Sequence, residues 1–170
     1  RIARVDVSAA LGEPGVVAAF TGADLEGQIN GLPTAWTVSA DMKAPPHMPL
    51  ATDKVRYVGD AVAVVVAKDR YQAADALAAI DVDYEQLPAV VDMPAALQHG
   101  STLVHDDVPN NRCFTFNEEH GDYAATTQAE DIVVVKRSFI NQRLIPSAME
   151  PRAVVAQHNL GTGELTVWSA

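Results

Sequence analysis

The chain has 170 residues, of which 48% are hydrophobic and 20% are charged, a composition typical of a soluble globular protein. Its formal net charge of -10 disfavours binding to nucleic acid or to anionic membranes, because their phosphates would repel it. Cys113 is the one cysteine, so the sequence offers neither an internal disulfide nor a cysteine-ligated zinc or iron–sulfur site. No apolar run reaches the roughly 18 residues that a membrane span needs.

The N-terminal part of the chain predicts two short strands followed by a long loop. Residues 1–7 (RIARVDV) and 16–20 (VVAAF) have the apolar patterns of short strands. Residues 26–49 carry prolines, glycines and Trp36 with little periodicity. This stretch therefore predicts an irregular loop, with Trp36 as a packing anchor.

Residues 50–92 contain the clearest pattern, which is a strand, a helix and a second strand. Residues 61–67 (AVAVVVA) are apolar throughout, as in a strand buried on both faces. Asp69 and Gln72 predict a capping-box-like pair at the start of the helix. Residues 81–85 (DVDYE) alternate like a half-exposed strand. About thirty residues thus form a βαβ unit, right-handed if its strands are parallel neighbours, with no residues arranged for chemistry.

The rest of the chain changes from a mixed α/β pattern to a strand-rich one. Residues 93–97 predict a short helix, and residues 101–117 are rich in turn-forming residues, which favours a linker. Residues 132–140 (IVVVKRSFI) predict a strong strand. Residues 152–157 and 165–168 predict two more strands, so consecutive antiparallel strands are expected here.

Common catalytic motifs are absent from the sequence, including HExxH, GxGxxG, the P-loop and GxSxG. His105, Asp106 and Asp107 are residue types that bind divalent metals, but a solvated acidic loop is the favoured interpretation. Residues 141–152 (NQRLIPSAMEPR) form a polar, proline-containing stretch between two predicted strands. Their composition leaves both an ordinary loop and a functional site open.

Three stretches, in this order, resemble the large, molybdenum-binding subunit of the xanthine dehydrogenase, aldehyde oxidase and aerobic carbon monoxide dehydrogenase family. They are residues 1–25 (RIARVDVSAALGEPGVVAAFTGADL), residues 50–92 (with VRYVGDAVAVVVA and VDYEQLPAVVD) and residues 141–156 (NQRLIPSAMEPRAVVA). The MEPR sequence at 149–152 is closer to the carbon monoxide dehydrogenase-like branch than to the eukaryotic xanthine oxidases.

The resemblance implies an α/β fold with three parts. Residues 1–112 would form an α/β hammerhead domain with a mixed sheet, and residues 113–131 a linker with a short helix. Residues 132–170 would be the truncated start of a molybdopterin-binding domain. We therefore expect the N-terminal part of a catalytic large subunit, inactive by itself. The alternative is a standalone, non-catalytic hammerhead scaffold or subunit-assembly module.

The resemblance also implies a molybdenum–pterin cofactor, held mostly by residues after Ala170, which hydroxylates carbon or oxidises carbon monoxide. In relatives with this loop, a glutamine eight residues before the Glu of MEPR approaches the molybdenum ligands. That position is Gln142 here, and its neutral amide can donate a hydrogen bond to an oxo group without adding charge. No catalytic residue or metal ligand is expected within the chain.

Partners follow from the same resemblance. Iron–sulfur clusters and FAD are expected on an iron–sulfur subunit and a flavin subunit, in a cytoplasmic dimer of heterotrimers. The single cysteine is compatible with that reducing compartment. The substrate is expected to be a small molecule, and carbon monoxide, a purine, an aldehyde and an N-heterocycle all remain open.

Overall fold

The computed structural model describes residues 1–33, 36–142, 144–145 and 147–170. The chain separates into two compact units, Arg1–Glu119 and His120–Ala170. Within the described part of the chain, no helix is long and apolar enough to cross a membrane.

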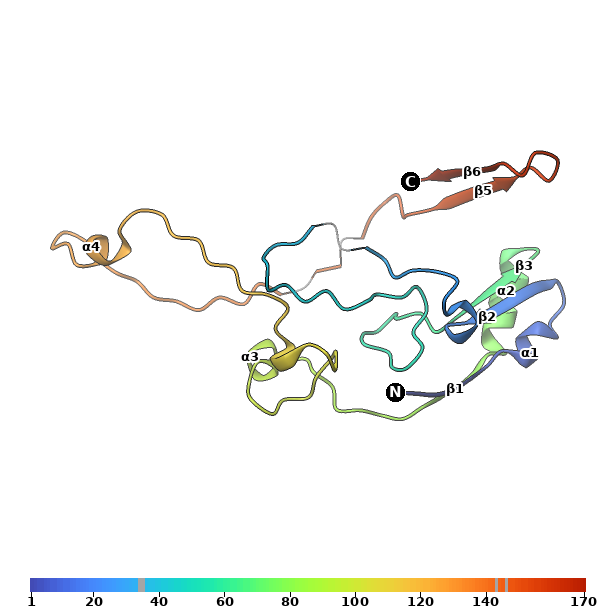
Figure 1. The fold of residues 1–170 in the computed structure, drawn as a ribbon, viewed down its shortest axis with the longest axis horizontal. Coiled ribbons are helices and arrows are strands. Elements are labelled where there is room, and N and C mark those ends of the chain that lie inside the picture. The colour runs from blue at the N-terminus through green and yellow to red at the C-terminus, as the bar shows by residue number, and fades with distance from the viewer. Residues whose placement is uncertain (34–35, 143, 146) are drawn as a thin grey trace. The chain divides into compact units, whose positions relative to one another are not determined.

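Four strands of the first unit form two antiparallel pairs (Figure 1). β1 (Ile2–Asp6) pairs with β4 (Asp81–Tyr84), and β2 (Val16–Thr21) pairs with β3 (Ala63–Ala67). α2 (Arg70–Ala78) follows β3 and precedes β4, so the predicted order of strand, helix and strand is confirmed.

The condition attached to the predicted βαβ unit, that the strands before and after α2 are parallel neighbours, is not met. β3 and β4 each pair with a strand from the N-terminal part of the chain, and α2 connects the two separate pairs. The α/β class of the fold is confirmed, and every strand pair among the described residues is antiparallel.

α2 begins where the Asp69 side chain caps it. The carboxylate accepts hydrogen bonds from the backbone N–H groups of Tyr71 and Gln72, at 2.9 and 3.0 Å. The predicted capping box is incomplete, because Gln72 Oε1 is buried without a hydrogen-bond partner among the described residues. α2 contacts α1 (Ser8–Leu11), and each helix has one fully buried alanine, Ala76 and Ala10.

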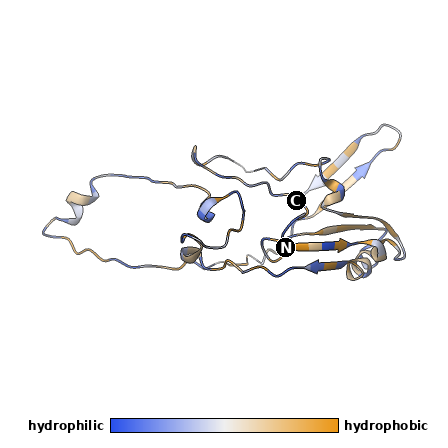
Figure 2. Cartoon of the chain, turned by 60° about the horizontal axis from the view of Figure 1, so that its bottom comes forward, coloured by the Kyte–Doolittle hydropathy of each residue, from blue (hydrophilic) through white to orange (hydrophobic). Residues whose placement is uncertain are grey.

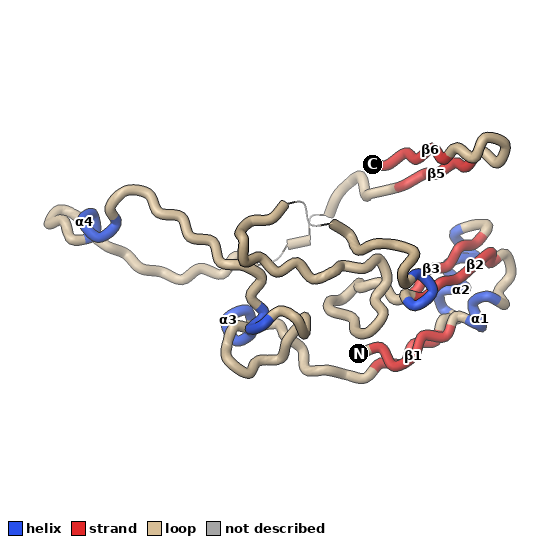
Figure 3. Tube along the Cα trace, viewed as in Figure 1, coloured by secondary structure: helices blue, strands red, loops and turns tan. Residues whose placement is uncertain are grey.

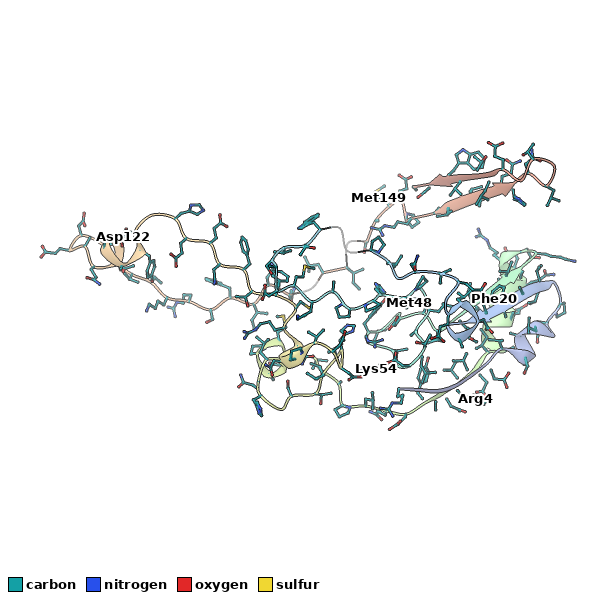
Figure 4. The ribbon with its side chains drawn as sticks, in the orientation of Figure 1. Arg4, Phe20, Met48, Lys54, Asp122 and Met149 are labelled. Carbon is teal, nitrogen blue, oxygen red and sulfur yellow. The ribbon has the colours of Figure 1, made fainter. Side chains whose placement is uncertain are left out.

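Successive residues of β3 face different environments, although their side chains are all apolar. Val64 and Val66 are 40% and 45% exposed, while Val65 between them is half-buried. The predicted burial of this strand on both faces is therefore wrong within the described chain. Phe20 of β2 (labelled in Figure 4) lies opposite Val64 and is also exposed. Figure 2 colours each residue by its hydropathy, and the exposed residues Phe20, Val64 and Val66 of this strand pair are all hydrophobic.

The long loop between η1 (Ala23–Leu25) and β3 is irregular, as predicted. Trp36 is 74% exposed, so its expected role as a packing anchor is wrong. His47 instead makes a cross-loop contact, because its Nε2 lies 3.0 Å from the Tyr57 hydroxyl and the two rings meet edge to face. After β4, the first unit continues through α3 (Met93–Ala96) and η2 (Pro109–Asn111).

In its described residues, the second unit contains one short helix and one hairpin. They are α4 (Tyr123–Thr127) and the antiparallel strands β5 (Val154–His158) and β6 (Leu165–Ser169). Residues 132–140 form no strand (Figure 3), so that prediction is wrong here. A strand needs a hydrogen-bonded neighbour, and no described strand pairs with this stretch. Thr127 is half-buried, and the other described residues of the unit are exposed.

Candidate functional site

Gln142 lies in the second unit, on the segment between α4 and β5 that forms neither helix nor strand in its described residues (Figure 3). The residue is exposed, and no hydrogen bond joins its side chain to another described residue. Arg143 and Pro146 of the same predicted loop lie outside the described residues. Gln142 as a cofactor contact therefore stays a prediction.

The residue types of this loop fit one contact to a molybdenum–pterin group and not a complete site. An exposed carboxamide can donate a hydrogen bond to an oxo or pterin oxygen and accept one through its own oxygen. However, the described residues contain no group of three or more His, Cys, Asp or Glu side chains that could hold a metal ion.

A second candidate region lies in the first unit, where residues 101–112, which we call the junction loop, meet residues 53–56. Lys54, which is labelled in Figure 4, forms an ion pair with Asp106, with 3.0 Å between Nζ and Oδ1. The Lys54 side chain is only 12% exposed, whereas that of Asp106 is 80% exposed. The sequence left open whether Asp106 is a metal ligand or a solvated acid, and the structure places it in an ion pair with Lys54.

Further charges surround this ion pair. Arg56 forms a looser pair with Asp53, at 3.4 Å, and its Nε is buried without a hydrogen-bond partner among the described residues. Burial lowers the pKa of His105, and the charge of Arg56 lowers it further, with Lys54 adding to the effect and Asp107 and Asp53 opposing it. We call the following six residues the charged junction: Asp53, Lys54, Arg56, His105, Asp106 and Asp107.

Asn111 holds the junction loop in shape. Its Nδ2 donates to the backbone carbonyls of Ala96 and Thr102, at 3.0 and 2.9 Å, and its Oδ1 accepts from the N–H of Val104 at 2.8 Å. The backbone of Asn111 is left-handed, with a φ of 52°, a conformation that asparagine adopts more readily than most residues. The sequence marked this asparagine only as part of a turn, because its three partners cannot be read from local spacing.

A second charged cluster lies on the β1–β4 pair, around Arg4 (labelled in Figure 4). The Arg4 guanidinium donates to the carboxylates of Asp6 and Asp83, each at 2.9 Å, and to that of Asp81. Arg4 stands opposite Asp83 in the ladder, so the cluster supports the observed register. These side chains are exposed, and their carboxylates are already engaged with an arginine, so we assign them a structural role.

Comparison with known proteins adds two domain matches. The family model described as "Aldehyde oxidase and xanthine dehydrogenase, a/b hammerhead domain" matches residues 1–88. A second model, "Molybdopterin cofactor-binding domain", matches residues 104–170. Gln142 lies within the second match and the charged junction spans both.

Individual relatives align with almost the whole chain. The carbon monoxide dehydrogenase large chain of Afipia carboxidovorans is 37% identical, over 99% of this chain and 22% of its own length. The nicotine 6-hydroxylase large subunit of Paenarthrobacter nicotinovorans is 31% identical, over 99% and 20%. The crystal structure of quinoline 2-oxidoreductase from Pseudomonas putida 86 has a TM-score of 0.88 and 33% identity, and covers 100% of this chain and 21% of its own. The chain thus spans about a fifth of the length of these relatives.

Proposed function

The chain belongs to the aldehyde oxidase and xanthine dehydrogenase family, and we propose that it is part of the catalytic large subunit of a molybdenum hydroxylase. The observation that carries this proposal is the order of the two matches, a hammerhead domain followed by a molybdopterin cofactor-binding domain. Alignment of 99% of the chain with a carbon monoxide dehydrogenase large chain supports it. We propose the same division as the sequence predicts, with the hammerhead domain over residues 1–112, a linker over 113–131 and the cofactor-binding domain from 132.

The proposed cofactor of the intact subunit is a molybdenum–pterin group, which supplies the redox centre when bound. The contribution of this chain is the amide of Gln142, which would donate a hydrogen bond to an oxygen of that group. A neutral amide stabilises developing negative charge on such an oxygen without adding a charge of its own. The exposure of Gln142 supports this role, because its side chain is accessible to a group bound outside the described chain.

Partner subunits belong to the proposal. Relatives are named as a large chain, a large subunit and a subunit gamma of a dehydrogenase complex, which supports a multi-subunit enzyme. The partners we propose carry iron–sulfur clusters and FAD, in a dimer of heterotrimers. The exposed, free thiol of Cys113 is compatible with a reducing compartment, and the cytoplasm is the compartment we propose.

We propose a small molecule as the substrate. The similarity to known proteins does not indicate its chemical class. Relatives of comparable identity are named for carbon monoxide, nicotine and quinoline. Because these molecules share little chemistry, the residues that choose among them need not lie in this chain.

The proposal is tested by purifying the intact protein from its native host and measuring molybdenum and pterin content. We expect about one molybdenum and one pterin for each copy of the subunit, together with copurified iron–sulfur and flavin subunits. A stable protein of this length, free of molybdenum and of pterin, would instead support the standalone scaffold or assembly module. We expect residues 1–170 expressed alone to contain no molybdenum, because Gln142 is the one cofactor contact that we propose within them.

The role of Gln142 is tested in the intact enzyme with Gln142→Ala, using Gln128→Ala as the matched control. Both glutamines are exposed and lie in the same unit. We expect Gln142→Ala to lower kcat about tenfold or more and to alter the electron paramagnetic resonance spectrum of the molybdenum centre. Gln128→Ala should change neither quantity. An unchanged rate and spectrum in Gln142→Ala would remove Gln142 from the site.

A further inference from the structure

One face of the β2–β3 pair carries only apolar side chains. Opposite residues of an antiparallel ladder share a face, so Ala18 lies with Val66, and Phe20 (labelled in Figure 4) lies with Val64. We call these four residues the open strand face. Its three larger side chains are exposed, and Val17, at the irregularity in the ladder next to Ala18, is 66% exposed. Neither strand contains a charged residue, so this face offers apolar contact area and no charge.

The opposite face of the same strand pair is covered. α2 contacts both β2 and β3, and Val65, whose side chain points away from the open strand face, is half-buried. A strand that is apolar at every position, as β3 is, is typical of a sheet with cover on both faces. The exposed fractions show that the described residues leave the open strand face without such a cover.

The small size of the open strand face limits what can cover it. A stable interface between separate proteins buries about 800 Å² and about 20–30 residues on each side, because association costs translational and rotational freedom. The four side chains of this face, even together with Val17, fall well short of that. A second copy of this chain is opposed further by its formal net charge of -10. Polypeptide of the same chain avoids the cost of association, because its effective concentration is already high.

The relatives contain the additional polypeptide that such a cover needs. The chain aligns with 22% of the carbon monoxide dehydrogenase large chain and with 21% of the quinoline 2-oxidoreductase chain. A large subunit of this kind therefore has about four fifths of its length outside the part that corresponds to residues 1–170.

We propose that an apolar segment of the same large subunit, from outside residues 1–170, packs on the open strand face. The proposal rests on the proposed function, because it needs the longer polypeptide of a molybdenum hydroxylase large subunit. The occupant contacts Phe20 and Val64 with aliphatic or aromatic side chains, since the face has no charge with which a buried polar group could pair. The open strand face is thus an interface within one subunit, and it is not available to a partner subunit.

The experiment is photo-crosslinking in the intact, purified enzyme, with the photoreactive amino acid p-benzoylphenylalanine in place of Phe20. Ultraviolet light joins the benzophenone to an adjacent carbon–hydrogen bond, and mass spectrometry of the resulting peptides identifies the residue reached. The replacement keeps an aromatic ring at the position. A second variant carries the same amino acid in place of Val17, which is more exposed, in case the first variant does not fold.

The matched control carries p-benzoylphenylalanine in place of Tyr71 on α2. Tyr71 is 77% exposed, and the exposed Asp75 lies one helical turn later on the same side of the helix. An apolar segment would have to bury a charge to pack there, so we expect a crosslink yield at least about threefold lower than at Phe20.

We expect the probe at Phe20 to reach a residue of the large subunit outside residues 1–170, without raising the apparent mass of the subunit on a denaturing gel. A crosslink to another subunit, to a second copy or to a residue within 1–170 would overturn the proposal, and so would an unreacted probe. Equal yields at Phe20 and Tyr71 would also overturn it, because the contact would not be specific to the apolar face.

The molybdenum and pterin content of the same preparation separates this proposal from the proposed function. If the cofactor is present and the expected crosslink does not form, the interface is wrong and the proposed function stands. If the expected crosslink forms in a longer polypeptide that holds no cofactor, the proposed function is wrong and the interface stands.

Discussion

The two units of the chain differ in whether they bury their own apolar residues. The first unit pairs its strands across long stretches of sequence, covers one face of β3 with α2 and buries Ala10, Leu50, Ala51, Ala76 and Val108. The second unit has comparable apolar runs, but Val133, Phe139 and Ile140 are 87%, 89% and 91% exposed. Apolar composition therefore does not by itself make a folded unit, because burial also requires neighbouring polypeptide.

The hairpin of the second unit shows the same dependence. Its two faces both carry apolar pairs, Val155 with Trp168 on one and Ala156 with Val167 on the other. Strands with apolar side chains on both faces are typical of sheets covered on both sides, and an isolated two-stranded hairpin is marginal in water. We infer that this hairpin gains its stability from contacts outside the described chain.

The largest expected difference appears when the two units are expressed separately. Residues 1–119 should show a cooperative thermal transition by circular dichroism, because their strand pairs close within the unit. Residues 120–170 should show no cooperative transition and little protection from hydrogen exchange. A cooperative transition in residues 120–170 alone would contradict the contrast between the units.

Ala76→Leu should destabilise the first unit by about 1–3 kcal/mol, because a larger side chain cannot fit the fully buried position without displacing its neighbours. Ala74→Leu is the matched control on the same helix, since Ala74 is exposed. It should change the free energy of unfolding by less than about 0.5 kcal/mol. Urea denaturation of the two variants measures the difference, and equal effects would show that α2 is not packed as described.

Asn111→Ala should destabilise the junction loop by about 1–2 kcal/mol, because the variant leaves three backbone groups without their partner. Asn110→Ala is the matched control. Asn110 also has a positive φ, of 58°, so an alanine causes similar backbone strain at either position. The difference in stability between the two variants therefore measures the hydrogen bonds of the Asn111 side chain. Hydrogen exchange at residues 101–112 reports the effect, and similar rates in both variants would show that the Asn111 side chain does not hold the junction loop.

The sequence predicted those parts of the fold whose causes are local. Asp69 precedes an apolar helix and caps it, and the alternation at residues 81–85 became β4. The pairing of β4 with β1 was not predictable in this way, because the partners lie about eighty residues apart and no local signal specifies them. Residues 132–140 show the opposite case, because their sequence pattern predicts a strand but they form no strand without a neighbouring strand to pair with.

The candidate sites also depend on information that the local sequence does not contain. Gln142 was identified through its position in a family-like motif, and nothing in its local sequence would have singled it out. The pair of Lys54 and Asp106 joins residues 52 positions apart, so the sequence could present each only as a surface charge. The acidic run at residues 106–107 could have indicated a nearby cation, but not which one.

The pairing of β1 with β4 also constrains how the chain is made. Ile2 meets Tyr84, so the first strand leaves the ribosome long before its partner exists. At typical rates of synthesis this interval is on the order of ten seconds. Throughout it, the edge of β1 has no partner strand and Arg4 lacks the carboxylates of Asp81 and Asp83, so the nascent segment depends on chaperones or on its own charge to avoid association.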